Sequence, residues 1–159
     1  MKTLKMGIVG FGNMGTAHCR GLVAGKAKNV KLAAIADTSP ARREAARKEF
    51  PDVPVFASAK EMFESGVIEA VEIAVPHYDH PAIAVDAFEH GLHVLVEKPA
   101  GVYTKQVLEM NEAAKKSGLV FGIMYNQRTN PVYQKIRQMV QNGELGHIKR
   151  VNWTITNWY

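Results

Sequence analysis

The fold of this chain is decided by residues 4–15, LKMGIVGFGNMG, at its start. A largely apolar run of strand length leads directly into Gly10, Gly12 and Gly15, which have the spacing G-x-G-x-x-G. Between a strand and a helix, the first glycine permits a tight turn, the second lets the backbone approach a pyrophosphate, and the third lets helix and strand pack closely. The amino terminus of the following helix attracts the anion. The stretch therefore predicts a strand, a phosphate-binding turn and a helix.

Beyond this stretch, apolar runs of strand length alternate with segments of helical period. The expected strands are residues 4–9, 31–36, 53–56, 70–75, 93–96 and 120–125, and the expected helices are residues 16–22, 40–50, 58–66, 80–90 and 104–117. Such alternation is the signature of parallel βαβ units. The predicted class is therefore α/β, with a doubly wound parallel sheet of the Rossmann type.

The pattern changes after Tyr125. A helix is expected from Pro131 to about Gln141, and from Val151 to Tyr159 apolar and polar residues alternate as they do in a strand. We expect residues 1–125 to form a dinucleotide-binding domain and residues 126–159 to begin a second, α+β domain. Since the alternation stops without a turn signal, we expect that second domain to be truncated and the chain to be a fragment.

The composition is that of an ordinary globular domain. The 159 residues are 47% hydrophobic and 22% charged, which argues against a disordered or fibrous chain. A single cysteine, Cys19, cannot form an internal disulfide, and no run approaches the roughly 18 apolar residues of a membrane span. The net charge of +5 is too mild to indicate nucleic-acid binding. We therefore expect a cytoplasmic protein without nucleic-acid or membrane partners.

An acidic residue in the expected place supports dinucleotide binding. Asp37 ends the second expected strand, 22 residues after Gly15, where this fold places a carboxylate on the adenosine ribose hydroxyls. A carboxylate about 4 Å from a 2′-phosphate costs roughly 4 kcal/mol at an effective dielectric constant of about 20, so NAD is favoured over NADP. The residues predicted to bind the cofactor here are Gly10, Phe11, Gly12, Asn13, Met14, Gly15, Asp37 and Thr38.

Two arginines complicate the choice of cofactor. Arg42 and Arg43 follow Asp37 closely and could reach a 2′-phosphate. With the alternating charges of the same helix they also form the pattern of an ordinary solvated face, and this is the interpretation we adopt.

Glu97, Lys98 and Pro99 come directly after the fifth expected strand. Ligands of doubly wound folds bind at this carboxyl edge of the sheet. A lysine at that edge can polarise or protonate an oxygen beside a nicotinamide, although position alone equally allows an ordinary surface lysine.

Four stretches together resemble the Gfo/Idh/MocA oxidoreductases, the family of glucose-fructose oxidoreductase and inositol dehydrogenase. They are GFGNMG at 10–15, PHYDHP at 76–81, HVLVEKP at 93–99 and RTNP at 128–131. The resemblance covers essentially the whole chain. It implies hydride transfer between a nicotinamide and a secondary alcohol or carbonyl of a sugar, polyol or cyclitol, on a Rossmann domain followed by a large open-sheet domain.

The resemblance also implies roles for individual residues. Lys98 would be catalytic and contact the nicotinamide ribose and the substrate, while Glu97 and Pro99 would shape its loop, with a cis Lys98–Pro99 bond. Three residues, Pro76, His77 and His80, would line the nicotinamide side of the cleft. Family members carry a further Asp and His in the second domain, so this chain by itself should be inactive. Homo-oligomerisation through that missing domain is also implied.

Other functions remain as alternatives. The first is a regulator of the same fold that senses a dinucleotide without turnover, and the second is a redox-assisted, NAD-dependent glycoside hydrolase. The pairs His77 with His80 and His90 with His93 have a ligand-like spacing, but no cysteine or acidic cluster completes a tetrahedral set. No metal site is therefore predicted.

Overall fold

The computed structural model describes residues 2–156, and the chain divides into two compact units, Met1–Met124 and Tyr125–Tyr159. The first unit contains one six-stranded sheet in the order β3-β2-β1-β4-β5-β6, in which every neighbouring pair is parallel. Its strands are β1 Leu4–Val9, β2 Val30–Ala36, β3 Val55–Phe56, β4 Ala70–Ile73, β5 His93–Val96 and β6 Phe121–Ile123. This order is that of a dinucleotide-binding Rossmann sheet, which confirms the predicted fold class.

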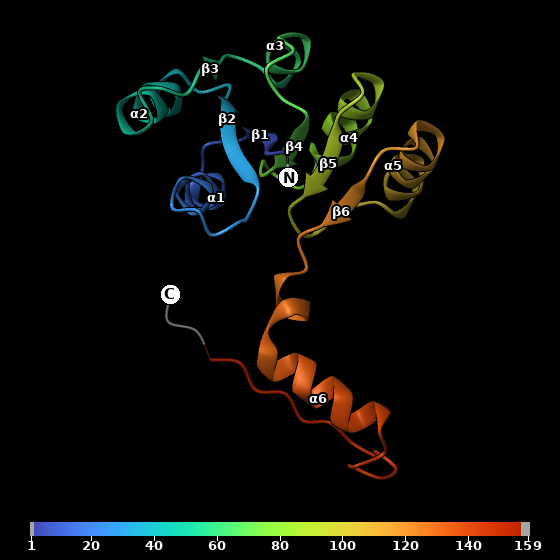
Figure 1. Cartoon of the computed structure of the whole chain (residues 1–159). Helices are drawn as coiled ribbons and strands as arrows, with labels where there is room; N and C mark the ends of the chain where they lie inside the picture. Colours follow the sequence, from blue (N-terminus) through green and yellow to red (C-terminus); the bar gives the residue numbers. More distant parts are fainter. Residues whose placement is uncertain (1, 157–159) are drawn as a thin grey trace. The chain divides into compact units, whose positions relative to one another are not determined.

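Helices cover both faces of the sheet (Figure 1). They are α1 Asn13–Val23, α2 Pro40–Glu49, α3 Ala59–Glu64, α4 His80–Glu89 and α5 Thr104–Ser117. Because side chains alternate along a strand, neighbouring residues of β1 enter different cores. Ile8 packs with Cys19 and Phe50 beneath α1 and α2, whereas Val9 joins the core formed with α3, α4 and α5. Among the described residues these two apolar layers hold the sheet from both sides.

Local signals explain where the helices begin. Ser39 caps α2, and its hydroxyl accepts from the backbone N–H of Arg42 at 3.5 Å, with Pro40 in the first turn. Ser58 caps α3 and accepts from Glu61 N at 3.1 Å. The Glu61 side chain returns to the N–H of Ala57, one residue before the position that a standard capping box would use.

The second unit contains the 3-10 helix η1 Asn126–Thr129 and the helix α6 Pro131–Gln141, whose amino terminus is capped by the side chain of Asn130. The strand expected after residue 150 is wrong for residues 151–156, which form no strand. A strand requires a neighbour for its backbone groups, and no described segment pairs with this one. Trp153 instead stacks on Tyr133, with ring centroids 5.3 Å apart. Trp158 and Tyr159 lie outside the described residues.

No helix within residues 2–156 combines the length and the apolar character that a bilayer crossing requires.

Candidate functional site

The residues that could bind a ligand or take part in a reaction lie at one edge of the sheet. Gly10 follows β1, Asp37 follows β2, Pro76 lies three residues beyond the end of β4, and Lys98 comes shortly after β5. Because the strands are parallel, their carboxyl ends meet at the same edge, which is where doubly wound folds bind ligands. The structure thus places the predicted site residues of this unit at one side of the sheet.

The three glycines of the turn have different structural roles. Gly10 has a φ of +97°, and a Cβ atom on it would lie 2.5 Å from the carbonyl oxygen of Ala74. A Cβ atom on Gly15 would lie 1.8 Å from the carbonyl oxygen of Gly10, so only glycine lets α1 approach the turn. At Gly12 the nearest atoms belong to the flexible end of Arg42, 3.8 Å away. The backbone of Gly12 therefore remains open to a ligand.

The amino terminus of α1 has no side-chain cap, and Gly12 stands at its N-cap position. Asn13 and Met14, in the first turn, are exposed. Phe11 differs from the others, since its side chain is buried and packs edge-on against Phe50. Of the six predicted residues in the turn, Phe11 thus has its ring in the core, where the ring cannot contact a ligand.

Asp37 is 6% exposed and firmly oriented. Its Oδ2 accepts from the N–H of Phe11 at 2.7 Å, and its Oδ1 accepts from the N–H of Ser39 at 2.8 Å. A carboxylate has about four lone-pair sites, so each oxygen can still accept another hydrogen bond. Thr38, beside it, is exposed at the same edge. The carboxylate is therefore held in place and can still receive ribose hydroxyls.

The two arginines have partners that the sequence did not reveal. Arg43 donates from Nη1 to the carbonyl oxygens of Asp37 at 3.0 Å and Thr38 at 2.8 Å, which fixes the turn after β2. Arg42 has its Nη1 3.7 Å from Asp37 Oδ2 and lies beside Gly12. The two arginines are therefore more than members of a solvated face.

A cavity of about 280 Å³ opens beside these groups. The residues that line it belong to the turns after β1, β2 and β4 and to adjoining helices: Val9, Gly10, Ala36, Asp37, Thr38, Arg42, Ala59, Ala74, Val75, Pro76, Asp79 and Ile83. A glycine turn, an oriented carboxylate and a cavity beside them fit the adenosine half of a dinucleotide.

Lys98 stands at the same edge in a well-supported loop. Its side chain is exposed, while Glu97 beside it is 5% exposed. Glu97 Oε2 accepts from the backbone N–H of Lys98 at 3.0 Å. The Lys98–Pro99 peptide bond is cis, which confirms the expectation drawn from the family resemblance.

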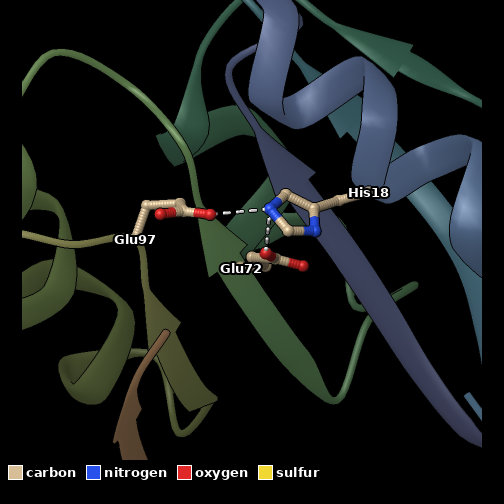
Figure 2. A group of neighbouring side chains, drawn as sticks. All are labelled: His18, Glu72 and Glu97. Atoms are coloured by element: carbon tan, nitrogen blue, oxygen red, sulfur yellow. Dashed lines mark hydrogen bonds and ion pairs between the residues drawn. The ribbon is translucent and has the colours of Figure 1, made fainter. Parts of the chain in front are cut away.

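Figure 2 shows a cluster behind this loop that sequence reasoning missed. His18, from α1, has its Nε2 2.8 Å from Glu97 Oε1 and 3.1 Å from Glu72 Oε1. Burial raises the pKa of Glu72 to about 7, opposed by His18 and assisted by the charge of Glu97. The available signal was Glu72 itself, a carboxylate in the middle of the otherwise apolar run of β4.

The predicted nicotinamide-side residues lie in different environments. Pro76 and His77 are exposed in the turn after β4. His80 is fully buried, with Nε2 2.8 Å from the carbonyl oxygen of Val75 and Nδ1 2.8 Å from that of Pro99. His80 therefore joins the turn after β4 to the loop after β5 and presents no ring surface of its own.

Comparisons with known proteins agree with this geometry. Residues 4–125 match the family described as an oxidoreductase family with an NAD-binding Rossmann fold. Inositol 2-dehydrogenase of Corynebacterium glutamicum is 30% identical over 150 residues, which are 92% of this chain and 44% of that protein. The rhizopine catabolism protein MocA of Rhizobium meliloti is 30% identical over 152 residues, 96% of this chain and 47% of that protein. The chain thus spans about half the length of these curated relatives.

Among solved structures, scyllo-inositol dehydrogenase from Lactobacillus casei, with bound NAD(H) and scyllo-inositol, matches with a TM-score of 0.85 and 31% identity. The match covers 91% of this chain and 43% of that one. Myo-inositol 2-dehydrogenase from Lactobacillus plantarum gives the same TM-score at 32% identity, over 92% of this chain and 43% of that one.

Proposed function

Since the chain belongs to the Gfo/Idh/MocA oxidoreductases, a family with an NAD-binding Rossmann fold, we propose that it supplies the cofactor-binding part of a cyclitol, sugar or polyol dehydrogenase. The observation that carries the proposal is the oriented Asp37 carboxylate, bonded to the glycine turn at the edge where Lys98 also lies. The inositol dehydrogenases among its relatives support a cyclitol as the substrate class.

Different residues of this chain would bind different parts of the dinucleotide. The amides at the start of α1 and the open backbone of Gly12 would hold the pyrophosphate. Asp37 would accept from the adenosine ribose hydroxyls and repel a 2′-phosphate, which favours NAD over NADP. The bound nicotinamide supplies or accepts the hydride. Pro76 and His77 would line its pocket, while His80 and Glu97 keep the surrounding loops in position.

Lys98 is the proposed catalytic residue. Its ammonium group would donate a hydrogen bond to the reacting oxygen of the substrate and hold a proton at Nζ for transfer to that oxygen. The Glu97 carboxylate and the Pro99 carbonyl fix the backbone on both sides of Lys98, so the side chain projects from an ordered loop. Homo-oligomerisation, a cytoplasmic location and the absence of nucleic-acid partners stay predictions.

The test has two stages. NADH and NADPH are titrated into the chain by fluorescence, and tighter binding of NADH is expected. Reduction of NAD by myo-inositol and scyllo-inositol is then followed at 340 nm with the full gene product. Lys98→Ala should lower turnover at least about a hundredfold and leave NADH affinity within a few-fold, as loss of an acid/base group does.

The exposed Lys116 in the last turn of α5 provides the matched control, because Lys116→Ala removes the same charge at the end of the helix that lies opposite the carboxyl edge of the sheet. Equal turnover in Lys98→Ala and the wild type would refute the catalytic role. Tight NADH binding without turnover on any polyol would instead favour a dinucleotide sensor.

A further inference from the structure

A second group of side chains converges away from the dinucleotide cradle. His18 comes from α1, Glu72 from β4 and Glu97 from the residue after β5, and all three point at one another in Figure 2. The Nε2 atom and one carboxylate oxygen from each glutamate lie within 4.8 Å of one another. Three different elements thus direct one nitrogen and two oxygen donors to a common point.

Hydrogen bonding within the described residues does not satisfy this group. An imidazole nitrogen carries at most one hydrogen, and His18 Nε2 is hydrogen-bonded to Glu97 Oε1 at 2.8 Å. Glu72 Oε1 lies only 3.1 Å from the same nitrogen but has no hydrogen-bond partner, and the Glu72 side chain is 5% exposed. A buried acceptor without a partner is costly, so this oxygen indicates that a ligand is needed.

We propose that His18, Glu72 and Glu97 bind one divalent transition-metal ion. The charge agrees, because two carboxylates and a neutral imidazole carry the −2 that the ion neutralises. The geometry also agrees: with metal–ligand bonds of about 2.1 Å, neighbouring ligands of an octahedral ion lie about 3.0 Å apart. The two His18–carboxylate separations, 2.8 and 3.1 Å, bracket that value.

The donor set narrows the choice of metal. Imidazole suits zinc, iron, nickel and copper, whereas carboxylates suit manganese, magnesium and calcium. One nitrogen with two carboxylate oxygens therefore favours Zn²⁺, Mn²⁺ or Fe²⁺ over Mg²⁺ and Ca²⁺. A cavity of about 430 Å³, lined in part by His18 and Glu72, borders the cluster and gives an entry path and room for water ligands.

The ion would act on the structure of the neighbouring loop. Glu97 presents Oε1 to the cluster and Oε2 to the backbone N–H of Lys98. A metal on Oε1 would orient the Glu97 carboxylate and thereby the loop that begins with Lys98. It would also tie this loop to α1, the helix whose first turn faces the phosphate site.

The test needs neither cofactor nor activity. The chain is treated with a chelator, dialysed, and titrated calorimetrically with Zn²⁺ and with Mn²⁺, and one ion per chain is expected. Glu72→Gln and His18→Gln should each weaken binding at least about tenfold. His90→Gln serves as the matched control, since His90 pairs with Asp86 on the surface at 3.3 Å, and it should leave the affinity unchanged.

Two calorimetric results would overturn the proposal. One is the absence of binding for both ions, and the other is equal affinity in Glu72→Gln and the wild type, which would show adventitious surface binding. A measurement on the wild type covers the case in which a variant does not fold. Bound Mn²⁺ should broaden the NMR signals of the His18 ring and of the Lys98 amide, and unaffected signals at saturating Mn²⁺ would also overturn it. Failure of the chain to bind NADH would contradict the proposed function and would leave the metal proposal unaffected.

Discussion

The Oδ2 atom of Asp37 accepts a hydrogen bond from the backbone N–H of Phe11 at 2.7 Å. Phe11 stands between Gly10 and Gly12, so this bond joins the end of β2 to the glycine turn after β1. The carboxylate proposed to contact the ribose and the turn proposed to contact the pyrophosphate are therefore coupled.

Removing the charge of Asp37 should change the choice of dinucleotide. Asp37→Asn keeps an acceptor near Phe11 but no longer repels a 2′-phosphate, and Arg42 then stands 3.7 Å from the altered group. We expect the preference for NADH over NADPH to narrow by about 1 to 4 kcal/mol. Fluorescence titrations with NADH and with NADPH measure this preference. Asp52→Asn, at an exposed position, is the control, and an unchanged preference in Asp37→Asn would contradict the assigned role.

Alanine at three glycines should separate binding from folding. Gly12→Ala should weaken NADH binding at least about tenfold with little loss of stability, because its Cβ meets no backbone in the chain. Gly15→Ala should destabilise the domain severely, because its Cβ would collide with the Gly10 carbonyl. Gly21→Ala, in open surroundings on α1, should stabilise by up to about 1 kcal/mol. Chemical denaturation and NADH titration distinguish the three, and equal NADH affinity in Gly12→Ala would count against the open-backbone argument.

Cys19 should be chemically inert in the folded chain. It is fully buried, and burial, assisted by the charge of Glu72, raises the pKa of its thiol to about 12. At pH 8 only about one molecule in 10⁴ would carry the reactive thiolate. We expect no reaction with dithiobis(nitrobenzoate) over an hour, followed by release of one equivalent of chromophore in guanidinium. Rapid reaction of the folded chain would show that α1 opens readily.

Glu72 should make stability depend on pH when a chelator is present. Its pKa is about 7 in the folded chain against 4.5 when unperturbed, so the folded state binds more protons between these values. The free energy of unfolding should therefore fall from about pH 4.5 to about pH 7 and change no further through this group above pH 7. Glu72→Gln should remove this part of the slope. Denaturation curves at several pH values measure it, and identical slopes in both proteins would contradict the burial of an ionisable Glu72.

His80 should matter more than its neighbour His77. His80→Ala removes the buried ring that lies 2.8 Å from the carbonyl oxygens of Val75 and Pro99, at a cost of about 1 to 3 kcal/mol for a hydrogen bond lost there. His77→Ala changes an exposed side chain in the same turn and should alter the free energy of unfolding by less than about 0.5 kcal/mol. Thermal and urea unfolding of both variants test this. Similar losses in the two would mean that His80 has no special structural role.

The features that sequence alone could predict are local ones. Gly10 and Asp37 each follow a recognisable strand, so the position of each at the sheet edge follows from parallel pairing. The His18–Glu72–Glu97 cluster could not be found in this way, because its members come from three separated segments and meet only through the pairing of β4 with β5 and the position of α1 beside the sheet.

The segment after residue 150 shows the opposite limit. The alternation of apolar and polar residues indicates which side chains a strand there would bury. A strand also needs a neighbouring strand to pair with, and the sequence pattern of one segment does not show whether such a neighbour exists. His80 shows a third limit. The family resemblance placed it near the nicotinamide, whereas only the packed structure shows its ring enclosed between the Val75 and Pro99 carbonyls.

The strand order has a consequence for synthesis on the ribosome. β1 lies inside the sheet, β2 and then β3 extend it on one side, and β4, β5 and β6 extend it on the other. When each strand after β1 is translated, the strand that it pairs with has already been made and still has an unpaired edge. No strand has to be inserted between two strands that are already paired. The nascent chain can therefore build the sheet in the order in which its strands are translated, with β6 added last.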